Sequence, residues 1–148
     1  SKANDTRWAH RPKINWKKAE LRHIEGTIEH RIFSALQHMI VVRKAIPAFA
    51  DFNNRQLLSI DNPHLFGFVR ISPNKRDHIL VIGNFSPDYQ NLDLSHLACH
   101  PFDCHDQDLL IDLYSQNAPE IFEKQLVLAP FQFYWLSKMQ PSLTTTLL

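Results

Sequence analysis

The side chains best suited to bind a metal ion are concentrated in one short stretch of the sequence. Cys99 and Cys104 lie close together, and each is followed directly by a histidine, His100 and His105. Structural zinc sites usually take paired ligands from two separated turns, which this spacing does not provide. We therefore expect no metal, no other cofactor and no disulfide between the two cysteines in this chain.

Other imidazole and indole side chains are weaker candidates for a binding site. No helical spacing would bring together, around one metal, His10, His23, His30 and His38. Trp8 and Trp16 could stack on a sugar ring, although aromatic side chains more often pack between domains. Trp135 alternates with Phe131 and Phe133 along a predicted strand, which favours a place in the core or on the sheet surface.

The longest element that could position these side chains is a helix from Thr27 to Ala45. Thr27 can cap the first backbone amides, and Pro47 ends the helix. Between them, apolar side chains recur every four residues and form one apolar face: Ile28, Ile32, Leu36 and Ile40. A β domain that buries its own core would leave this face uncovered, so we expect another surface to pack on it. The stretch Ile14 to Ile24 also favours helix.

After Pro47 the pattern changes to short, β-rich runs separated by turns that use Pro, Asn and Asp. The predicted strands are residues 57–60, 65–71, 78–85, 109–114, 125–128 and 131–136. Regularly spaced short strands of this kind indicate an antiparallel sandwich or barrel. We expect a mainly β fold, an antiparallel Greek-key β-sandwich from about Phe52 to Met139, followed by a flexible tail over residues 140–148.

Length and composition exclude several classes of function. The 148 residues fit one domain with a flanking element, and 44% of them are hydrophobic, which is enough for a core. The formal net charge is +1, so we expect neither nucleic acid nor an anionic membrane as the main partner. No apolar run approaches the roughly 20 residues of a membrane span. Two cysteines are too few for a disulfide scaffold, which favours a reduced, cytoplasmic setting.

Four segments, in this order along the chain, resemble a known family: DTRWAHRP (residues 5–12), LQHMIVVR (36–43), GNFS (83–86) and LAPFQFYWL (128–136). The family is the amylosucrases, within glycoside hydrolase family 13 of the α-amylase superfamily. The first segment resembles the loop after the last barrel strand, and the second resembles the final barrel helix. The last two are similar to the C-terminal β domain, the fourth to its closing strand. The first segment is the most specific of the four.

The resemblance implies that the chain is the C-terminal end of a longer enzyme built on a (β/α)8 barrel. Such an enzyme moves the glucosyl unit of sucrose to a growing α-glucan or to water, with one carboxylate as nucleophile and another as acid/base. Those carboxylates would lie upstream of Ser1, so we expect no catalytic residue here and no activity of the isolated fragment. Residues 1–50 would be a remnant of the barrel, and residues 51–139 the C-terminal β-sandwich domain.

Arg7 is the one substrate-binding residue that the resemblance implies. It matches the arginine that, in amylosucrases, pairs with an aspartate at the bottom of the sucrose pocket. A buried guanidinium can hold a carboxylate through two hydrogen bonds while it donates to sugar hydroxyls. The aspartate would also lie upstream, so without the barrel we expect Arg7 to be a solvated loop arginine.

The expected partners are the missing catalytic barrel of the same chain and, through the parent enzyme, sucrose or α-glucan. Self-association through the helix from Thr27 to Ala45, or cover by residues 1–26, would bury the apolar helix face. Two alternatives stay open. The chain could be a free-standing carbohydrate-binding or interaction module, because sandwiches host many functions; such a module would cover the helix with its own sheet. The parent could also be a sucrose hydrolase or a trehalose-forming enzyme of family 13.

Overall fold

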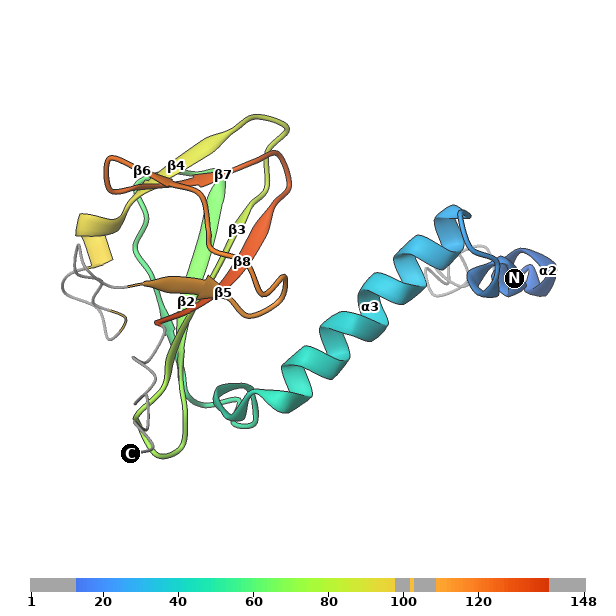
Figure 1. Cartoon of the computed structure of the whole chain (residues 1–148), viewed down its shortest axis with the longest axis horizontal. Helices are drawn as coiled ribbons and strands as arrows, with labels where there is room; N and C mark the ends of the chain where they lie inside the picture. Colours follow the sequence, from blue (N-terminus) through green and yellow to red (C-terminus); the bar gives the residue numbers. More distant parts are fainter. Residues whose placement is uncertain (1–12, 98–101, 103–108, 139–148) are drawn as a thin grey trace, which may run out of the picture. The chain divides into compact units, whose positions relative to one another are not determined.

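The computed structural model of the chain describes residues 13–97, 102 and 109–138 (Figure 1). Its contacts divide the chain into two compact units, residues 1–41 and residues 42–148. The division falls inside the long helix, so the last turn of that helix belongs to the second unit. None of the described helices is long and apolar enough to cross a membrane.

The described part of the first unit is helical. It contains α2 (Trp16–Ala19), the 3-10 helix η2 (Glu20–His23) and most of α3 (Ile28–Ala45). Thr27 begins α3, because its hydroxyl oxygen accepts the backbone N–H of His30 at 3.1 Å. Gly26, with a φ of +86°, makes the left-handed turn before it. The long helix that the sequence predicts is confirmed.

The second unit is a sandwich of two antiparallel sheets. Sheet A has the strand order β1-β2-β3-β8-β5 and sheet B the order β4-β7-β6 (Figure 1). The strands are β1 (Arg55–Leu57), β2 (Leu65–Ile71), β3 (His78–Asn84), β4 (Gln90–Asp93), β5 (Leu110–Asp112), β6 (Ile121–Phe122), β7 (Gln125–Leu128) and β8 (Phe133–Lys138). Two 3-10 helices, η3 (Pro47–Phe49) and η4 (Leu94–Leu97), lie between them in the chain. The mainly β, antiparallel sandwich is confirmed.

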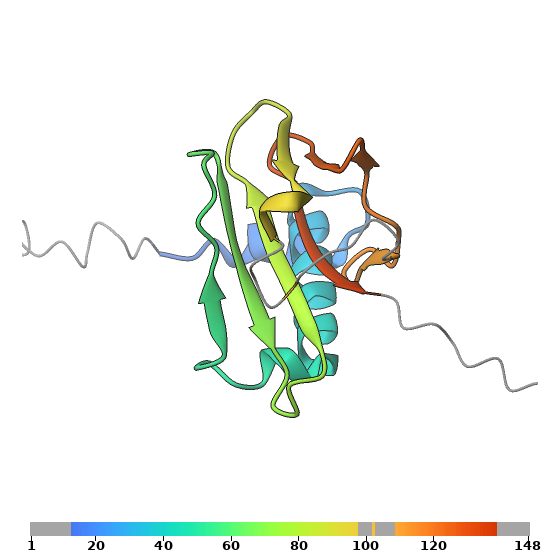
Figure 2. The same cartoon turned by 90° about the vertical axis from the view of Figure 1, so that its left-hand side faces the viewer.

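Four connections pass from one sheet to the other: β3 to β4, β4 to β5, β5 to β6 and β7 to β8. As a result β8 pairs with β3, from Gly83 opposite Phe133 to Ile79 opposite Ser137, although the two strands are far apart in the sequence. Figure 2 shows β1, β2, β3 and β8 side by side in sheet A. Such exchange between sheets is typical of Greek-key sandwiches.

The core lies between the two sheets and is dominated by leucine. Alternation along each strand sends every second side chain inward. In β8, Tyr134 and Leu136 belong to the core, whereas Phe133 and Trp135 point to the outer side of sheet A. The other buried core residues are Leu65, Val69, Leu80, Ile82, Leu92, Leu94, Leu97, Phe102, Leu110, Leu126 and Leu128.

Several details differ from the sequence predictions. The strand predicted at residues 57–60 is instead Arg55–Leu57, and the strand predicted at residues 109–114 is limited to Leu110–Asp112. The last strand begins at Phe133 rather than at Phe131, because Phe131 lies in the preceding turn with a φ of 57° and is 68% exposed. Phe131 therefore does not share the alternation of Phe133 and Trp135. Strand β4 was not predicted because its sequence, QNLD, contains a single apolar residue. Strand β6 was not predicted because it has two residues and its hairpin turn uses Glu123 and Lys124, at φ of 47° and 67°, where Asn-Gly is the usual signal.

Candidate functional site

The substrate-binding candidate Arg7 lies outside the described residues, as do Trp8, Cys99 and Cys104. Trp16, the second member of the suggested tryptophan pair, is 67% exposed. Within the described part of the chain, no group of three or more His, Cys, Asp or Glu side chains could hold a metal ion.

One side of α3 is occupied by the segment that precedes it. The ring nitrogen Nδ1 of His30 lies 2.9 Å from the carbonyl oxygen of Arg22, and Nε2 lies 3.3 Å from the Ser34 hydroxyl. The rings of Phe33 and His23 meet edge to face, with 6.2 Å between their centroids, and the Arg22 guanidinium lies 5.9 Å from the centroid of the Phe33 ring. These contacts give His30 a structural role and hold η2 against the helix.

Another side of α3 is apolar and exposed. Four side chains form what we call the helix stripe, namely Ile28, Ile32, Leu36 and Ile40, which are 68%, 57%, 52% and 51% exposed. The helix has no buried residue at all. Ile14 and Trp16, which belong to the segment 1–26 that was expected as cover, are themselves exposed. The described part of the first unit therefore leaves the helix stripe open.

Asn84 is the centre of a buried hydrogen-bond network at one end of the sandwich. Its amide nitrogen donates to the carbonyl oxygens of Asp88 at 2.7 Å and Ala129 at 2.9 Å. Its amide oxygen accepts the backbone N–H of Ser86 at 2.9 Å and the Ser86 hydroxyl at 2.8 Å. Because buried polar groups need partners, the network fixes the end of β3 against the loop after β7.

Gln132 closes this network from the other side. Its side-chain oxygen accepts the backbone N–H of Ala129 at 2.7 Å, and its carbonyl accepts the N–H of Asn84 at 2.8 Å. The N–H of Phe131 donates to the Ser86 carbonyl at 3.2 Å, which holds the left-handed turn. The segments GNFS and LAPFQFYWL, which carry half of the sequence resemblance, thus meet in one structural joint. Their residues build the turn that joins the end of β3 to the start of β8.

Asp112 is the one buried carboxylate among the described residues, with 2% exposure. Its Oδ1 accepts the backbone N–H groups of Trp135 at 2.9 Å and Tyr114 at 3.3 Å, and its Oδ2 accepts that of Ser115 at 3.0 Å. A carboxylate with three backbone donors is held as a hydrogen-bond acceptor. It ends β5 and ties the following turn to β8.

Arg70 is a buried cation that sequence reasoning missed. It is 5% exposed, its Nε donates to the carbonyl of Ala48 at 3.2 Å, and a terminal nitrogen donates to the carbonyl of Asp51. The guanidinium lies 5.6 Å from the centroid of Phe49. Burial lowers the pKa of Arg70 from its ordinary value, and two neighbouring arginines lower it further. Arg70 occupies an outward position in the alternation of β2, where the sequence pattern predicts an exposed residue. No sequence signal therefore indicates that it is buried.

Asn54 strengthens the same joint. Its side-chain nitrogen donates to the carbonyl of Ala48 at 2.9 Å and to the carbonyl of Ile71. We use the name latch for Arg70, Asn54 and the carbonyls of Ala48 and Asp51 that they hold. The latch fastens the segment directly after α3 to β2, and Ala48 is completely buried there.

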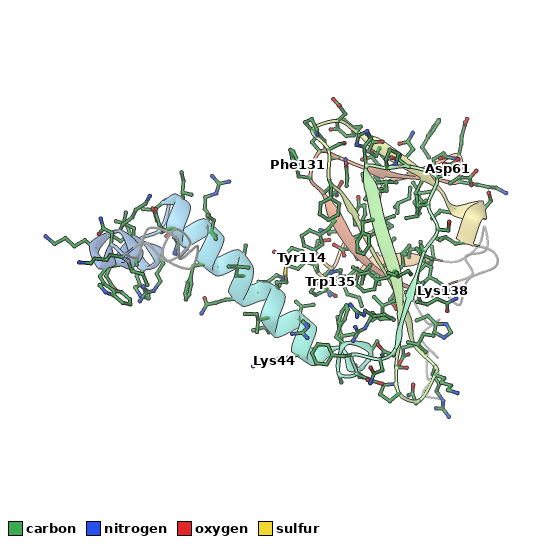
Figure 3. All side chains as sticks on the ribbon, turned by 180° about the vertical axis from the view of Figure 1, so that it is seen from behind. Lys44, Asp61, Tyr114, Phe131, Trp135 and Lys138 are labelled. Carbon is green, nitrogen blue, oxygen red and sulfur yellow. The ribbon has the colours of Figure 1, made fainter. Side chains whose placement is uncertain are left out.

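The outer side of sheet A carries six aromatic side chains that we call the aromatic face: Phe66, Phe68, Phe85, Tyr114, Phe133 and Trp135. Successive ring centroids are 6.0 Å apart for Phe66 and Phe68 and 6.5 Å apart for Phe66 and Phe85. The distances are 4.9 Å between Tyr114 and Phe133 and 6.1 Å between Phe133 and Trp135. Figure 3 shows Tyr114 and Trp135 side by side on the second unit.

The two ends of the aromatic face differ in cover. Phe49 of η3 packs on Trp135 with 4.9 Å between centroids, and Trp135 is 8% exposed. At the other end Phe66 is 52% and Phe85 70% exposed. Gly83 lies between the two ends of the aromatic face. A Cβ at this position would lie 3.4 Å from the Phe85 ring and 3.7 Å from the Cβ of Phe133. The segment after α3 therefore covers one end of the face and leaves the other open.

The fold has counterparts among solved structures, whereas no family model matches the chain. A variant of AmyP in complex with maltotriose matches with a TM-score of 0.57 at 18% identity, over 80% of this chain and 23% of the AmyP chain. AmyP in complex with maltose gives 0.56 at 18% identity, over 77% and 23% of the two chains. A mutant of MUTB soaked with trehalulose gives 0.46 at 19% identity, over 69% and 17%. This chain spans about a quarter of the length of AmyP.

Proposed function

We propose that this chain is the C-terminal region of an α-amylase-family enzyme of family 13, of the amylosucrase type. The observation that carries the proposal is the joint around Asn84. Two segments that resemble family 13 meet there in one hydrogen-bond network, inside a fold that AmyP shares. Both the resemblance and the fold therefore point to the same kind of parent.

In this proposal the chain contributes support and no chemistry. A retaining glycoside hydrolase needs two carboxyl groups about 5–5.5 Å apart, one as nucleophile and one as acid/base. The buried carboxylate of the described residues, Asp112, is occupied by three backbone donors. The catalytic pair would come from a barrel upstream of Ser1, and sucrose would be its glucosyl donor.

The support would be mechanical. The latch fastens the segment directly after α3 to sheet A. If α3 is the last helix of a barrel, the latch ties that barrel to the sandwich. The helix stripe would pack on the barrel, which gives its apolar character a cause.

The test compares the 148-residue chain with the same chain extended upstream by its own coding sequence. With sucrose, the extended protein should release fructose and build a glucan, whereas the 148-residue chain should release neither fructose nor glucose. Equal amounts of glucose and fructose from the extended protein would indicate a sucrose hydrolase instead. Turnover by the short chain that follows the protein through gel filtration would contradict the proposal.

The same preparation tests the alternative of a free-standing carbohydrate-binding module. Such a module would be retarded by glycogen in a native gel without any upstream sequence. Under our proposal the 148-residue chain migrates equally with and without glycogen.

A further inference from the structure

Three arginines lie close together where the segment after α3 meets β1 and β2. Arg55 and Arg70 are directly opposite each other on these two paired strands, and side chains in such positions have Cβ atoms about 4.5–5.5 Å apart. Arg43, in the last turn of α3, has its guanidinium 5.9 Å from the ring centroid of Phe52. All of these residues belong to the second unit, residues 42–148. We call the three arginines the arginine cluster.

The charges of the arginine cluster act on one another. Burial lowers the pKa of Arg70, and the positive charges of Arg55 and Arg43 lower it further, whereas the negative charge of Asp51 raises it. Among the described residues, no ion pair within 4.0 Å joins a carboxylate to a guanidinium of the cluster. Three cations therefore face one carboxylate, which leaves an excess of two positive charges.

Asp51 is a weak counter-charge for this group. Its side chain is exposed, and its Oδ1 accepts the backbone N–H of Asn53 at 2.9 Å. Arg70 donates instead to backbone carbonyl oxygens, which carry no net charge. Hydrogen bonds between described residues use Nε and one terminal nitrogen of Arg70, and no nitrogen of the other two arginines. Because each guanidinium has five N–H donors, most of the donors of the cluster remain for a ligand.

The pairing of Arg55 with Arg70 is unfavourable for the fold unless negative charge is added. Like charges directly opposite each other on paired strands destabilise a sheet. Protection of an edge strand accounts for a charge at Arg55, since β1 lies at the edge of sheet A. It does not account for a buried arginine opposite this residue. Natural proteins break such local rules mostly at functional sites.

The cluster is ordered in advance for a tetrahedral dianion. The rings of Phe49 and Phe52 lie 5.6 and 5.9 Å from the guanidinium groups of Arg70 and Arg43, and they order these cations without neutralising them. A guanidinium presents parallel N–H donors that match the oxygens of a phosphate group. A phosphate monoester carries a charge of about −1.5 to −2 at pH 7, which balances the excess of two positive charges. A carboxylate would balance only half of it.

We propose that Arg43, Arg55 and Arg70 form a binding site for a phosphate group, carried by inorganic phosphate or by a small phosphorylated molecule. Arg70 is the buried member of the site, and the other two arginines are exposed. Because Arg70 also belongs to the latch, a bound phosphate would tighten the joint between the segment after α3 and β2. The proposal does not depend on the proposed function, since the whole site lies in the second unit.

Titration of the isotope-labelled chain with inorganic phosphate, followed by NMR, is the first measurement. We expect saturable shifts of the amides of residues 43–55 and of Arg70, with a dissociation constant in the millimolar range or below. Sodium chloride of the same ionic strength should give no saturable shift, and equal effects of the two salts would overturn the proposal. Glucose 6-phosphate identifies the source of the phosphate group. Tighter binding than that of inorganic phosphate indicates a phosphorylated sugar, and equal or weaker binding indicates inorganic phosphate.

Two neutral variants test the exposed members of the site. Arg43→Gln and Arg55→Gln should each raise the dissociation constant for phosphate roughly tenfold, because each removes a charge-assisted pair of hydrogen bonds. The matched control is Arg76→Gln, at an exposed position between β2 and β3, which should leave the constant unchanged. An equal loss of affinity in all three variants would mean that phosphate responds only to net charge. An unchanged constant in both cluster variants would place phosphate elsewhere, and either result overturns the proposal.

Reversal of one charge separates ligand binding from a structural role. Arg55→Glu places a carboxylate opposite Arg70 and so removes the repulsion between β1 and β2. In phosphate-free buffer its midpoint of thermal unfolding should lie above that of the wild type. Added phosphate should raise the midpoint of the wild type and leave that of Arg55→Glu unchanged. A variant midpoint no higher than that of the wild type, or an equal response of both proteins to phosphate, contradicts the proposal.

The protein extended upstream distinguishes a ligand from a carboxylate of the same chain. If the site takes a ligand, the extended protein should bind phosphate with a similar dissociation constant, whether or not it acts on sucrose. If the 148-residue chain binds phosphate and the extended protein does not, an upstream carboxylate occupies the arginine cluster. The cluster would then be an interdomain contact, and the proposed ligand site would be wrong.

Discussion

Arg70 donates its Nε hydrogen to the carbonyl oxygen of Ala48 at 3.2 Å, across 22 positions of the sequence. The same carbonyl accepts the side chain of Asn54 at 2.9 Å. One backbone oxygen therefore joins β2, the segment after α3 and the loop that leads to β1. The Arg70 guanidinium is buried and donates to the carbonyl oxygens of Ala48 and Asp51. Loss of this one side chain would therefore remove both of its hydrogen bonds in the latch.

Replacement of this cation should loosen the latch. Arg70→Met keeps the stem that packs on Phe49 but loses the donors to Ala48 and Asp51, so we expect a loss of about 1–3 kcal/mol in the free energy of unfolding. Urea denaturation measures the loss, and hydrogen exchange should show faster exchange of the Phe49 and Ala50 amides. Arg76→Met, in an exposed turn, is the control. Equal stability of both variants would show that the latch is dispensable.

Asn84 should be among the most sensitive polar positions of the sandwich. Asn84→Ala leaves the carbonyls of Asp88 and Ala129 and the N–H of Ser86 without their partner, at a cost of about 1–3 kcal/mol or more. The midpoint of thermal unfolding should fall accordingly, whereas Asn91→Ala on the exposed side of β4 should leave it unchanged. If both substitutions have the same small effect, water replaces the amide and the network is not a structural joint.

Asp112 tests whether a buried carboxylate serves only as an acceptor. Asp112→Asn replaces one of the two acceptor oxygens by an NH2 group, which would face a backbone N–H that also donates, so we expect a loss of about 1.5–3 kcal/mol. The urea concentration at the midpoint of unfolding should be lower. Tryptophan fluorescence should also change, because the backbone N–H of Trp135 is one of the three donors. Asp61→Asn, at an exposed turn, provides the comparison. An unchanged midpoint for Asp112→Asn would mean that the turn holds without the carboxylate.

Arg7 is tested only in the protein extended upstream. If it lies at the bottom of a sucrose pocket, Arg7→Lys should lower kcat/KM for sucrose by roughly tenfold or more, because an ammonium cannot hold a carboxylate through two parallel bonds. Thermal stability should be unchanged, which separates a binding role from a structural one. Arg76→Lys should leave kcat/KM as it is. If the Arg7→Lys protein has the same kcat/KM for sucrose as the wild type, Arg7 does not belong to the proposed sucrose pocket.

The regular elements could be predicted because their periods are plain in the sequence. Ile28, Ile32 and Leu36 recur every four residues, and the runs that became β2, β3 and β7 were predicted within one residue of their observed ends. Thr27 was also identified as the start of α3. These features depend on local periodicity and capping, which neighbouring residues determine.

The joints could not be predicted because they depend on residues that are distant in the sequence. Arg70 is buried only because η3 folds over it, and Asp112 is buried only because β8 returns beside β5. Phe131 shows the same limit: its alternation with Phe133 predicted a strand, but the network around Ser86 holds it in a left-handed turn. The sequence resemblance located the Asn84 segments without revealing what they do.

The place of β8 in sheet A has a consequence for synthesis of the protein. It is the latest strand of the described chain, yet it lies between β3 and β5. During translation β3 has an open edge, and β5 has no neighbour at all, until residues 133–138 leave the ribosome. Strand pairs that close such long loops form slowly, and the leucines beneath them are available to chaperones in the meantime. A stop codon before Phe133 would therefore remove the middle of the sheet rather than shorten its end.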